Sequence, residues 1–378
     1  MTEPKIGIYG SEKLNGGVYN MLASFNKGLH DAFKAKFYDV EYMYKYHEDK
    51  ILPDLSIAFN GSGADFWEFY LNKGIPHIMW AVDSIFMHIY AAKLSMKFPN
   101  FIFACVSTSD IKAINHFMPN LPFLYLPHAV DTDFWLPDNS EKEHDIVFLS
   151  TLQDFEEKIN NFRQNWDKKR FDQFMTIYEY ALQNPDKSFW DIYNYFAIIF
   201  NFDMLDLNAY YQMFNSLCYT VTYTRRVHLI NKLKDFNVKV WGSPVWEKYI
   251  SGNVQYMGAA DIKDSLKIVP KSKIVLHLQP MQILDGLHER ILNATSANSF
   301  ILTDNNDVIK QSFGDTLGYY NGYTFDNLPE TVNYYLNNNA IREEKSNQSR
   351  KITLQNHTWR NRVTEIFDII NAVNDINE

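Results

Sequence analysis

Short apolar runs alternate with amphipathic stretches along the first third of the chain. Glycine, proline, aspartate and asparagine bound the runs, and apolar residues recur with a helical period between them. Strands that alternate with helices at this spacing form a parallel sheet through crossover connections. This pattern predicts a doubly wound α/β domain with helices at 65–72 and 110–117, another ending near residue 35, and strands at 5–9, 54–60, 77–82, 101–107 and 123–127.

The same alternation returns in the second half of the chain after two interruptions. Residues 131–144 are polar and charged, which predicts a linker. Residues 155–223 contain no convincing strand and have an aromatic pattern of helical period, which predicts a helical insertion. Beyond it we predict a helix at 287–297, a helical tail from residue 329, and strands at 145–150 (before the insertion), 238–241, 254–256, 273–278 and 299–303.

Two Rossmann-like domains facing a cleft are the architecture that follows from this pattern. A length of 378 residues suits two domains. We expect the first over residues 1–130, the linker over 131–144, the second over 145–355 and a terminal helix over 356–378.

Composition and charge restrict the function. The chain has 45 acidic and 36 basic residues, a net charge of −9, which argues against nucleic acid as the main partner. Its 2 cysteines form neither a disulfide framework nor a metal-ligand spacing. We find no signal peptide and no run of the ~20 apolar residues that a membrane helix needs, so a cytoplasmic location without an integral membrane segment is expected. The aromatic insertion suggests a protein partner, with core packing as the alternative.

Three polar or glycine-rich segments follow strands of the first domain, where open α/β sheets bind ligands. Gly16 and Gly17 would let backbone N–H groups approach an anion, or form a flexible turn. Asn60, Gly61 and Ser62 suit a close approach by a ligand, or a plain turn. The third candidate is a single carboxylate, that of Asp83.

Asp83 follows the apolar run HIMWAV directly. A carboxylate at a strand end that faces a cleft could act as a general base. The alternative is an N-cap for a helix that starts near Ser84.

The segment DGLHERILNATSANSFILTD (residues 285–304) carries the densest group of candidates. It is predicted to run from a loop through a helix into a strand. Asp285 and Asn293 are eight residues apart, which places them near one face of the helix start, and Arg290 lies one turn before Asn293. A helix N-terminus with a nearby arginine can bind a diphosphate, and polar side chains further along can reach ribose hydroxyls. An ordinary capped helix is the alternative.

This segment resembles the nucleotide-sugar site of GT-B glycosyltransferases, and in particular the CgeB-like (spore-maturation protein) family, whose pattern is G-x-x-x-R-x-F-E-A-x-A-x-G-x-F-x-L-T-D. Asp285 and Asn293 stand where the wider group carries two glutamates. Asn298 stands where a glycine is usual. The matching residues are Gly286, Arg290, Ala294, Phe300, Leu302, Thr303 and Asp304.

Four other segments extend the resemblance. LPHAVD (126–131) is similar to the family's stretch near the domain junction, and HDIVFLS (144–150) to the opening of its second domain. Residues 225–242 resemble its "RR…L…VxxWG" helix and strand, and residues 356–370 its terminal helix, which in GT-B folds crosses back onto the first domain. The predicted insertion has no counterpart in the resemblance.

The resemblance implies a glycosyltransferase, hexosyltransferase-like, that moves a sugar from a nucleotide-diphosphate sugar to a protein, surface polymer or other glycan acceptor. It implies no cofactor and no metal, and a UDP-sugar as the leading donor. Asp131-Thr132-Asp133 has the D-x-D form of a GT-A metal site, but we interpret it as linker. Asp83 and His128 are the catalytic candidates. The donor-binding candidates are Trp241, Gly242, Asp285, Gly286, His288, Arg290, Asn293, Thr303 and Asp304.

Two other functions stay open at this point. Because Asn293 replaces a glutamate, a non-catalytic GT-B-like protein that binds nucleotide sugars or acts as a scaffold is the main alternative. A nucleotide-sugar epimerase of the same two-domain shape is another.

Overall fold

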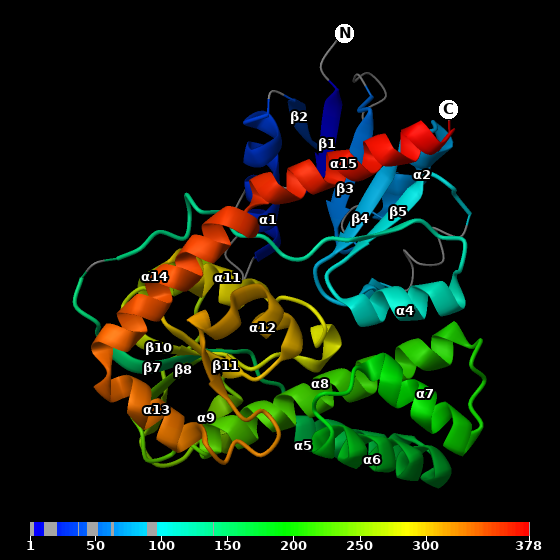
Figure 1. Cartoon of the computed structure of the whole chain (residues 1–378). Coiled ribbons are helices and arrows are strands. Elements are labelled where there is room, and N and C mark those ends of the chain that lie inside the picture. The colour runs from blue at the N-terminus through cyan, green and yellow to red at the C-terminus, as the bar shows by residue number, and fades with distance from the viewer. Residues whose placement is uncertain are drawn as a thin grey trace. The chain divides into compact units, whose positions relative to one another are not determined.

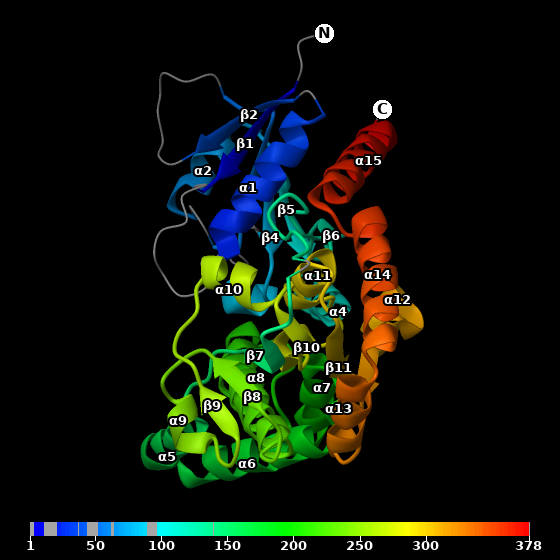
Figure 2. The ribbon, with the colours of Figure 1, turned by 90° about the vertical axis from the view of Figure 1, so that its left-hand side faces the viewer.

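The computed structural model describes residues 4–10, 21–36, 38–43, 52–61, 64–88, 97–138 and 140–377. The chain divides into two compact units, Met1–Trp135 with Ile352–Glu378, and Leu136–Lys351. The division after Trp135 falls inside the predicted linker. Each unit contains a six-stranded parallel sheet with helices around it (Figures 1 and 2), which confirms the predicted α/β fold class.

The sheet of unit 1 has the order β2-β1-β3-β4-β5-β6, and each neighbouring pair is parallel. Its elements are β1 (Lys5–Tyr9), α1 (Met21–Lys34), β2 (Asp39–Met43), β3 (Leu55–Phe59), α2 (Ala64–Asn72), β4 (His77–Ala81), η1 (Ile85–His88), β5 (Phe101–Cys105), α4 (Thr108–Phe117), β6 (Phe123–Tyr125) and α15 (Trp359–Asn377).

The central strands of unit 1 are continuous apolar runs because helices cover both faces of a parallel sheet. Every residue of β3 and β4 is buried. The edge strand β2 was not predicted. Its sequence DVEYM mixes charged and apolar residues, and four of its five positions are partly or fully exposed. An edge strand therefore lacks the apolar run that identifies its neighbours.

The C-terminal segment packs onto unit 1. The backbone N–H of Val130 donates to the carbonyl oxygen of His357 at 3.0 Å, and Val130 forms a parallel bridge with Thr358. Trp359, at the start of α15, is 4% exposed and lies 5.4 Å from the ring of Phe25. Figure 1 shows α15 lying across the sheet beside α1.

The sheet of unit 2 has the order β12-β11-β10-β7-β8-β9 and is also parallel throughout. Its elements are β7 (His144–Leu149), α5 (Phe155–Asn165), α6 (Lys168–Gln183), α7 (Phe189–Phe200), α8 (Leu207–Asn231), β8 (Val238–Trp241), α9 (Trp246–Tyr249), β9 (Val254–Tyr256), α10 (Ile262–Ile268), β10 (Ser272–Leu276), η2 (Met281–Ile283), α11 (Glu289–Ser296), β11 (Ile301–Asp304), α12 (Asp307–Phe313), η3 (Gly314–Thr316), β12 (Gly318–Tyr320), α13 (Leu328–Asn337) and α14 (Asn339–Asn356), which continues into unit 1.

The predicted insertion consists of the four helices α5 to α8, which lie together at one side of unit 2 in Figure 1. Each starts at a side chain that accepts a backbone N–H of the first turn: Asp154, Asp167, Ser188 and Asp206. Such N-caps stabilise a helix by about 1 kcal/mol each. The last helix runs to Asn231, beyond the predicted limit of residue 223, so its second half belongs to the core of the Rossmann-like domain.

Candidate functional site

The carboxyl ends of the parallel strands form one edge of the second sheet. Read from β9 to β12, the strand order is that of a Rossmann domain, and the chain order reverses between the neighbours β7 and β10. Ligands of such sheets bind beyond the strand ends at this reversal. The segment that leaves β10 there, residues 277–288, leads into α11 and contains several of the predicted donor-binding residues.

Gln279 fixes the shape of this loop from inside. The side chain is 1% exposed, and its Nε2 donates to the carbonyl oxygens of Ile283 and Gly286, both at 2.7 Å. Its backbone N–H donates to Asp304 Oδ1 at 2.9 Å. Sequence reasoning missed Gln279, because its role depends on carbonyl groups that only the folded loop brings together.

The helix α11 begins at Glu289, four residues after Asp285. Asp285 lies in the loop before the helix, and His288 takes the N-cap position with an extended backbone. The Nδ1 atom of His288 accepts the N–H of Arg290 at 3.1 Å and also lies 2.9 Å from Glu289 Oε2. One nitrogen cannot accept from the first and donate to the second at once, so the protonation of His288 decides which contact is the hydrogen bond.

Two polar side chains on the first turns of α11 are available to a ligand. Arg290 is half-buried, and its guanidinium has no hydrogen bond or ion pair to any residue that the structure describes. Asn293 is 6% exposed, and its carboxamide likewise has no hydrogen bond within the described ranges. A cation at a helix N-terminus attracts a diphosphate, and a carboxamide one turn later can bond hydroxyl groups.

A buried polar network supports the loop from below. Thr303 Oγ1 lies 2.9 Å from His277 Nδ1 and 3.2 Å from Asp304 Oδ1. Burial lowers the pKa of His277 well below its ordinary value, so the ring is neutral. Burial raises the pKa of Asp304, and the positive charge of Arg225 opposes that rise. Thr303 and Asp304, both predicted as donor-binding residues, thus contact the scaffold of the loop.

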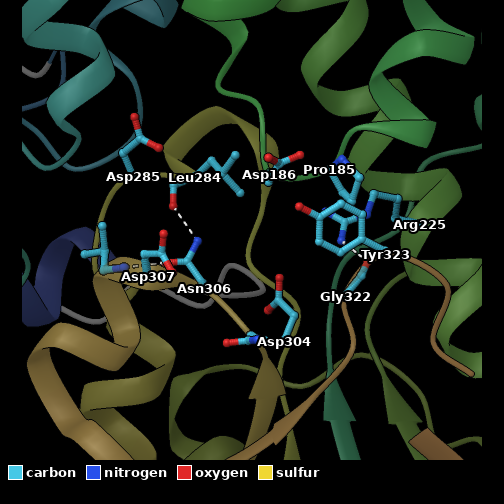
Figure 3. Close-up of a pocket in the computed structure, with 12 residues that line it drawn as sticks. Pro185, Asp186, Arg225, Leu284, Asp285, Asp304, Asn306, Asp307, Gly322 and Tyr323 are labelled. Carbon is cyan, nitrogen blue, oxygen red and sulfur yellow. Dashed lines mark hydrogen bonds between the residues drawn. The ribbon is translucent and has the colours of Figure 1, made fainter. Parts of the chain in front are cut away.

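A pocket of about 260 Å³ opens beside this loop (Figure 3). Of the predicted donor-binding residues, Asp285 and Asp304 line it, whereas Arg290 and Asn293 do not. The other lining residues come from the segment between α6 and α7, from α8, from the loop before α11, from the turn between β11 and α12 with the start of α12, and from the segment after β12: Pro185, Asp186, Arg225, Leu284, Asn305, Asn306, Asp307, Val308, Gly322 and Tyr323.

Trp241 and Gly242, at the end of β8, are part of the packing of unit 2. Trp241 is 8% exposed, and its ring centroid lies 5.5 Å from that of His144. A Cβ at position 242 would lie 2.1 Å from the carbonyl oxygen of Ser150, so only glycine permits this approach of the two backbones. Trp246 Nε1 donates to the same oxygen at 2.6 Å.

The strand ends of unit 1 show part of the predicted acceptor region. Asn60 has a left-handed backbone (φ 53°), and its Oδ1 accepts the N–H of Val82 at 3.0 Å. Gly61 follows it and is exposed. The remaining members of the predicted loops lie outside the described residues: Gly16, Gly17 and Ser62.

Asp83 is half-buried beyond the end of β4. Asp110 contacts the start of η1: its Oδ2 accepts the N–H of Ile85 at 3.0 Å, and its Oδ1 accepts the Ser84 hydroxyl at 2.8 Å. Asp110 itself is 3% exposed and was missed by the sequence reasoning.

His128 is a buried histidine held by the backbone. It is 1% exposed, and its Nε2 lies 2.7 Å from the carbonyl oxygen of Val82. Arg362 Nε donates to the His128 carbonyl oxygen at 3.4 Å. These contacts are those of a residue that joins the strand ends to the C-terminal segment.

In the described part of the chain, no three histidine, cysteine, aspartate or glutamate residues form a group that could hold a metal ion. In the D-x-D sequence, Asp131 Oδ1 accepts the N–H of Asp133 at 3.0 Å, which is a local turn. None of the helices within the described ranges combines the length and apolar character that a bilayer crossing requires.

Comparisons with known proteins agree with this architecture. Residues 225–368 match a family model described as glycosyl transferase-like. An uncharacterized protein of Aquifex aeolicus (strain VF5) is 21% identical over 261 residues, which cover 66% of this chain and 64% of that protein.

Three solved structures share the fold. Sucrose-phosphate synthase from Thermosynechococcus elongatus aligns with a TM-score of 0.58 and 7% identity over 99% of this chain and 100% of that one. The T4 phage β-glucosyltransferase aligns with a TM-score of 0.56 and 13% identity over 97% and 98%. The Anabaena protein HepE, in complex with UDP and glucose, aligns with a TM-score of 0.54 and 10% identity over 98% and 100%. The chain therefore has the GT-B fold of glycosyltransferases, and its residues 225–368 match the glycosyl transferase-like family.

Proposed function

We propose that this protein is a metal-independent, hexosyltransferase-like glycosyltransferase with a CgeB-like donor site. It moves a sugar from a nucleotide-diphosphate sugar to a glycan, protein or surface-polymer acceptor. The observation that carries the proposal is that two polar side chains at the start of α11, Arg290 and Asn293, have no hydrogen bond to a described residue and lie within the segment that matches the family model. The complex of the Anabaena relative with UDP and glucose supports a UDP-sugar as the first donor to test.

In the proposed reaction, an acceptor hydroxyl oxygen forms a bond to the anomeric carbon of the donor sugar. The bond between that carbon and the diphosphate oxygen breaks, and the nucleoside diphosphate leaves with the electron pair. Arg290 and the N–H groups at the start of α11 stabilise the negative charge on the leaving diphosphate. Asn293 and Asp285 position the ribose and the donor sugar. If the reaction inverts the anomeric centre, Asp83 accepts the acceptor's proton. If it retains the configuration, the departing diphosphate oxygen accepts that proton.

The helix start is prepared for this role before any ligand arrives. Gln279 holds the carbonyl oxygens of Ile283 and Gly286, so the loop that presents α11 does not need to be ordered on binding. A site that is already ordered loses less conformational entropy when the ligand binds.

Nucleotide titrations of matched variants test the proposal. UDP, GDP, CMP, dTDP and ADP are titrated by thermal shift, with and without magnesium, against wild type, Arg290→Ala and Lys263→Ala. Lys263 is an exposed cation on α10 and controls for net charge. We expect one diphosphate to stabilise wild type without magnesium and Arg290→Ala to bind it about 10- to 100-fold more weakly, the scale of a charge-assisted hydrogen bond. Equal binding by Arg290→Ala and wild type would reject the site.

The second candidate function is a non-catalytic protein that binds nucleotide sugars. The observation in its favour is Asn293, an uncharged carboxamide where the related site carries a glutamate. An Asn293→Glu variant that gains turnover from an inactive parent would favour this candidate. If Asn293→Ala instead removes existing activity, the protein is an enzyme adapted to asparagine. Product analysis without an acceptor identifies an epimerase, which converts the donor and needs no acceptor.

A further inference from the structure

A second cavity, of about 480 Å³, lies at the amino edge of the sheet of unit 2. It opens where the strands begin: Ser272 is the first residue of β10, Phe300 directly precedes β11, and Lys142 lies two residues before β7. The start of α11, by contrast, follows the carboxyl end of β10. Because the strands are parallel, the two places are at opposite edges of the sheet, and no predicted donor-binding residue lines this cavity.

Both chain segments that connect the two units line the cavity. The chain passes from unit 1 to unit 2 after Trp135, and residues 138 and 140–142 of the linker form one part of the wall. The chain returns to unit 1 after Lys351, near the end of α14, and residues of α14 between 339 and 347 form another part. A ligand that contacts both parts would therefore join the two connections to each other.

The charged side chains that line the cavity balance one another. Three are cationic and three are anionic: Lys142, Lys273 and Arg342, and Asp138, Glu141 and Glu343. Lys273 Nζ is paired with Asp145 Oδ1 at 2.6 Å. The Arg342 guanidinium donates to the carbonyl oxygen of Leu336 at 3.1 Å and to Asn339 Oδ1 at 2.7 Å. With no net charge, the lining attracts neither a phosphate nor a polyamine, and an uncharged ligand suits it best.

Asn298 adds a carboxamide to the cavity at a position where helices usually end in glycine. Ala297 is the C-cap of α11, so Asn298 is the next residue, and its backbone is left-handed (φ 55°). Glycine is the most common residue at this position because it adopts the left-handed conformation without strain, and asparagine is the usual substitute. The turn is thus the one that glycine would form, and the side chain is an addition that lines the cavity.

Asn298 and Asn347 together offer one hydrogen-bond acceptor and one donor. Asn298 Nδ2 donates to Asn347 Oδ1 at 3.1 Å. Among the residues that the structure describes, the buried Oδ1 of Asn298 has no donor and the Nδ2 of Asn347 has no acceptor. Turning both amides over exchanges these roles and leaves the same two kinds of group unused. Hydroxyl groups on neighbouring carbons of a sugar ring each donate and accept, so they can bond both amides at once.

We propose that this cavity binds an uncharged sugar of one or two rings, which bonds the Asn298–Asn347 pair and joins the linker to α14. The volume lies within the roughly 300–1,000 Å³ of small-molecule sites. On the linker, Glu141 lines the cavity without a hydrogen bond or ion pair to a described residue, and it can accept from further hydroxyl groups. The inference goes beyond the proposed sugar transfer and does not rest on it, because the cavity shares no residue with the start of α11.

A printed array of mono- and disaccharides tests the binding on the labelled full chain. Neutral glycans are compared with sialylated, sulfated and amino-sugar glycans, and the neutral glycan with the strongest signal is then titrated in solution. We expect binding to neutral glycans. Asn298→Gly keeps the left-handed turn and removes the carboxamide, so it should bind that glycan roughly tenfold more weakly, the scale of one or two hydrogen bonds.

Asn201→Gly is the matched control. Asn201 also has a left-handed backbone (φ 52°), is exposed, and does not line the cavity. It should bind the glycan like wild type. Hydrogen exchange with the same glycan should slow both in the linker peptide that contains Lys142 and in the α14 peptide from Asn339 to Asn347, and Asn298→Gly should show neither change.

Five results would overturn the proposal: no bound neutral glycan, equal binding of charged glycans, equal binding by Asn298→Gly and wild type, an equal loss in Asn201→Gly, or slower exchange in only one of the two peptides. A parallel UDP titration separates these outcomes from failure of the proposed function. Asn298→Gly should bind UDP like wild type, and Arg290→Ala should bind the neutral glycan like wild type.

Discussion

Replacing Gly28 by alanine should destabilise the protein, although the same change in most helices stabilises it. Gly28 lies in the interior of α1, where alanine is ordinarily better than glycine by roughly 0.5–1 kcal/mol. Here a Cβ atom would lie 2.3 Å from Cδ1 and Nε1 of the Trp359 indole. The absence of a side chain at Gly28 therefore allows α15 to pack closely on α1.

The surroundings of Trp359 determine the size of the effect. The residue is 4% exposed. Its ring centroid lies 5.4 Å from that of Phe25, 5.7 Å from that of Phe59 and 5.6 Å from that of Trp80. These rings leave the indole little room to withdraw, and overpacking of this kind costs about 1–3 kcal/mol. After the helix-propensity gain is subtracted, the middle of the two ranges gives a loss of roughly 1.3 kcal/mol in the free energy of unfolding of Gly28→Ala.

Urea denaturation followed by circular dichroism measures this change. The control is Trp359→Phe, whose smaller ring leaves space for the new methyl group. Combined with Trp359→Phe, the Gly28→Ala change should cost less than it does alone, with a coupling free energy of about 0.5–3 kcal/mol. If Gly28→Ala is as stable as wild type, or more stable, the close approach of α15 to α1 is refuted.

Two further changes have defined outcomes. Burial lowers the pKa of His77 to about 3 from its ordinary 6.5, so the unfolded chain binds a proton that the folded chain does not. The contribution of this group to stability is therefore complete above pH 6.5 and should fall by about 1.4 kcal/mol per pH unit below it. The free energy of unfolding of His77→Phe, measured across about pH 4–7, should depend less steeply on pH than that of wild type. An unchanged dependence would contradict a neutral, buried His77. Gln279→Leu leaves the carbonyl oxygens of Ile283 and Gly286 buried without a donor, at about 1–3 kcal/mol each. Both the melting temperature and the affinity for UDP should decrease, and wild-type values of both would contradict the role of Gln279.

Helices and strands could be predicted from the sequence where their own residues determine the secondary structure. The buried runs of β3 and β4 and the helix of α11 were predicted from their apolar pattern. The edge strand β2 was missed because its exposed face carries charged residues, and the three-residue β12 (GYY) is too short to show a period. Both become strands because a neighbouring strand offers hydrogen bonds, and this information lies outside their own sequences.

The residues of the candidate site also fall into two groups, those that are close in sequence and those that only the fold brings together. Arg290 and Asn293 could be predicted because one helix start places them together. Tyr323 and Asp186 line one pocket although they are far apart in sequence, and no local pattern relates them. The predicted helix began at residue 287, two residues too early, because residue spacing alone does not show that His288 is the N-cap.

The most direct test of the account is the release of nucleoside diphosphate from a panel of UDP-, GDP-, dTDP- and ADP-sugars, without magnesium. Wild type should release diphosphate from one donor, slowly with water as the acceptor and faster with a suitable acceptor. Arg290→Ala should lose most of this release, whereas Lys263→Ala should keep it. Release from no donor, or undiminished release by Arg290→Ala, would contradict the claim that the start of α11 holds the leaving diphosphate of a glycosyl transfer.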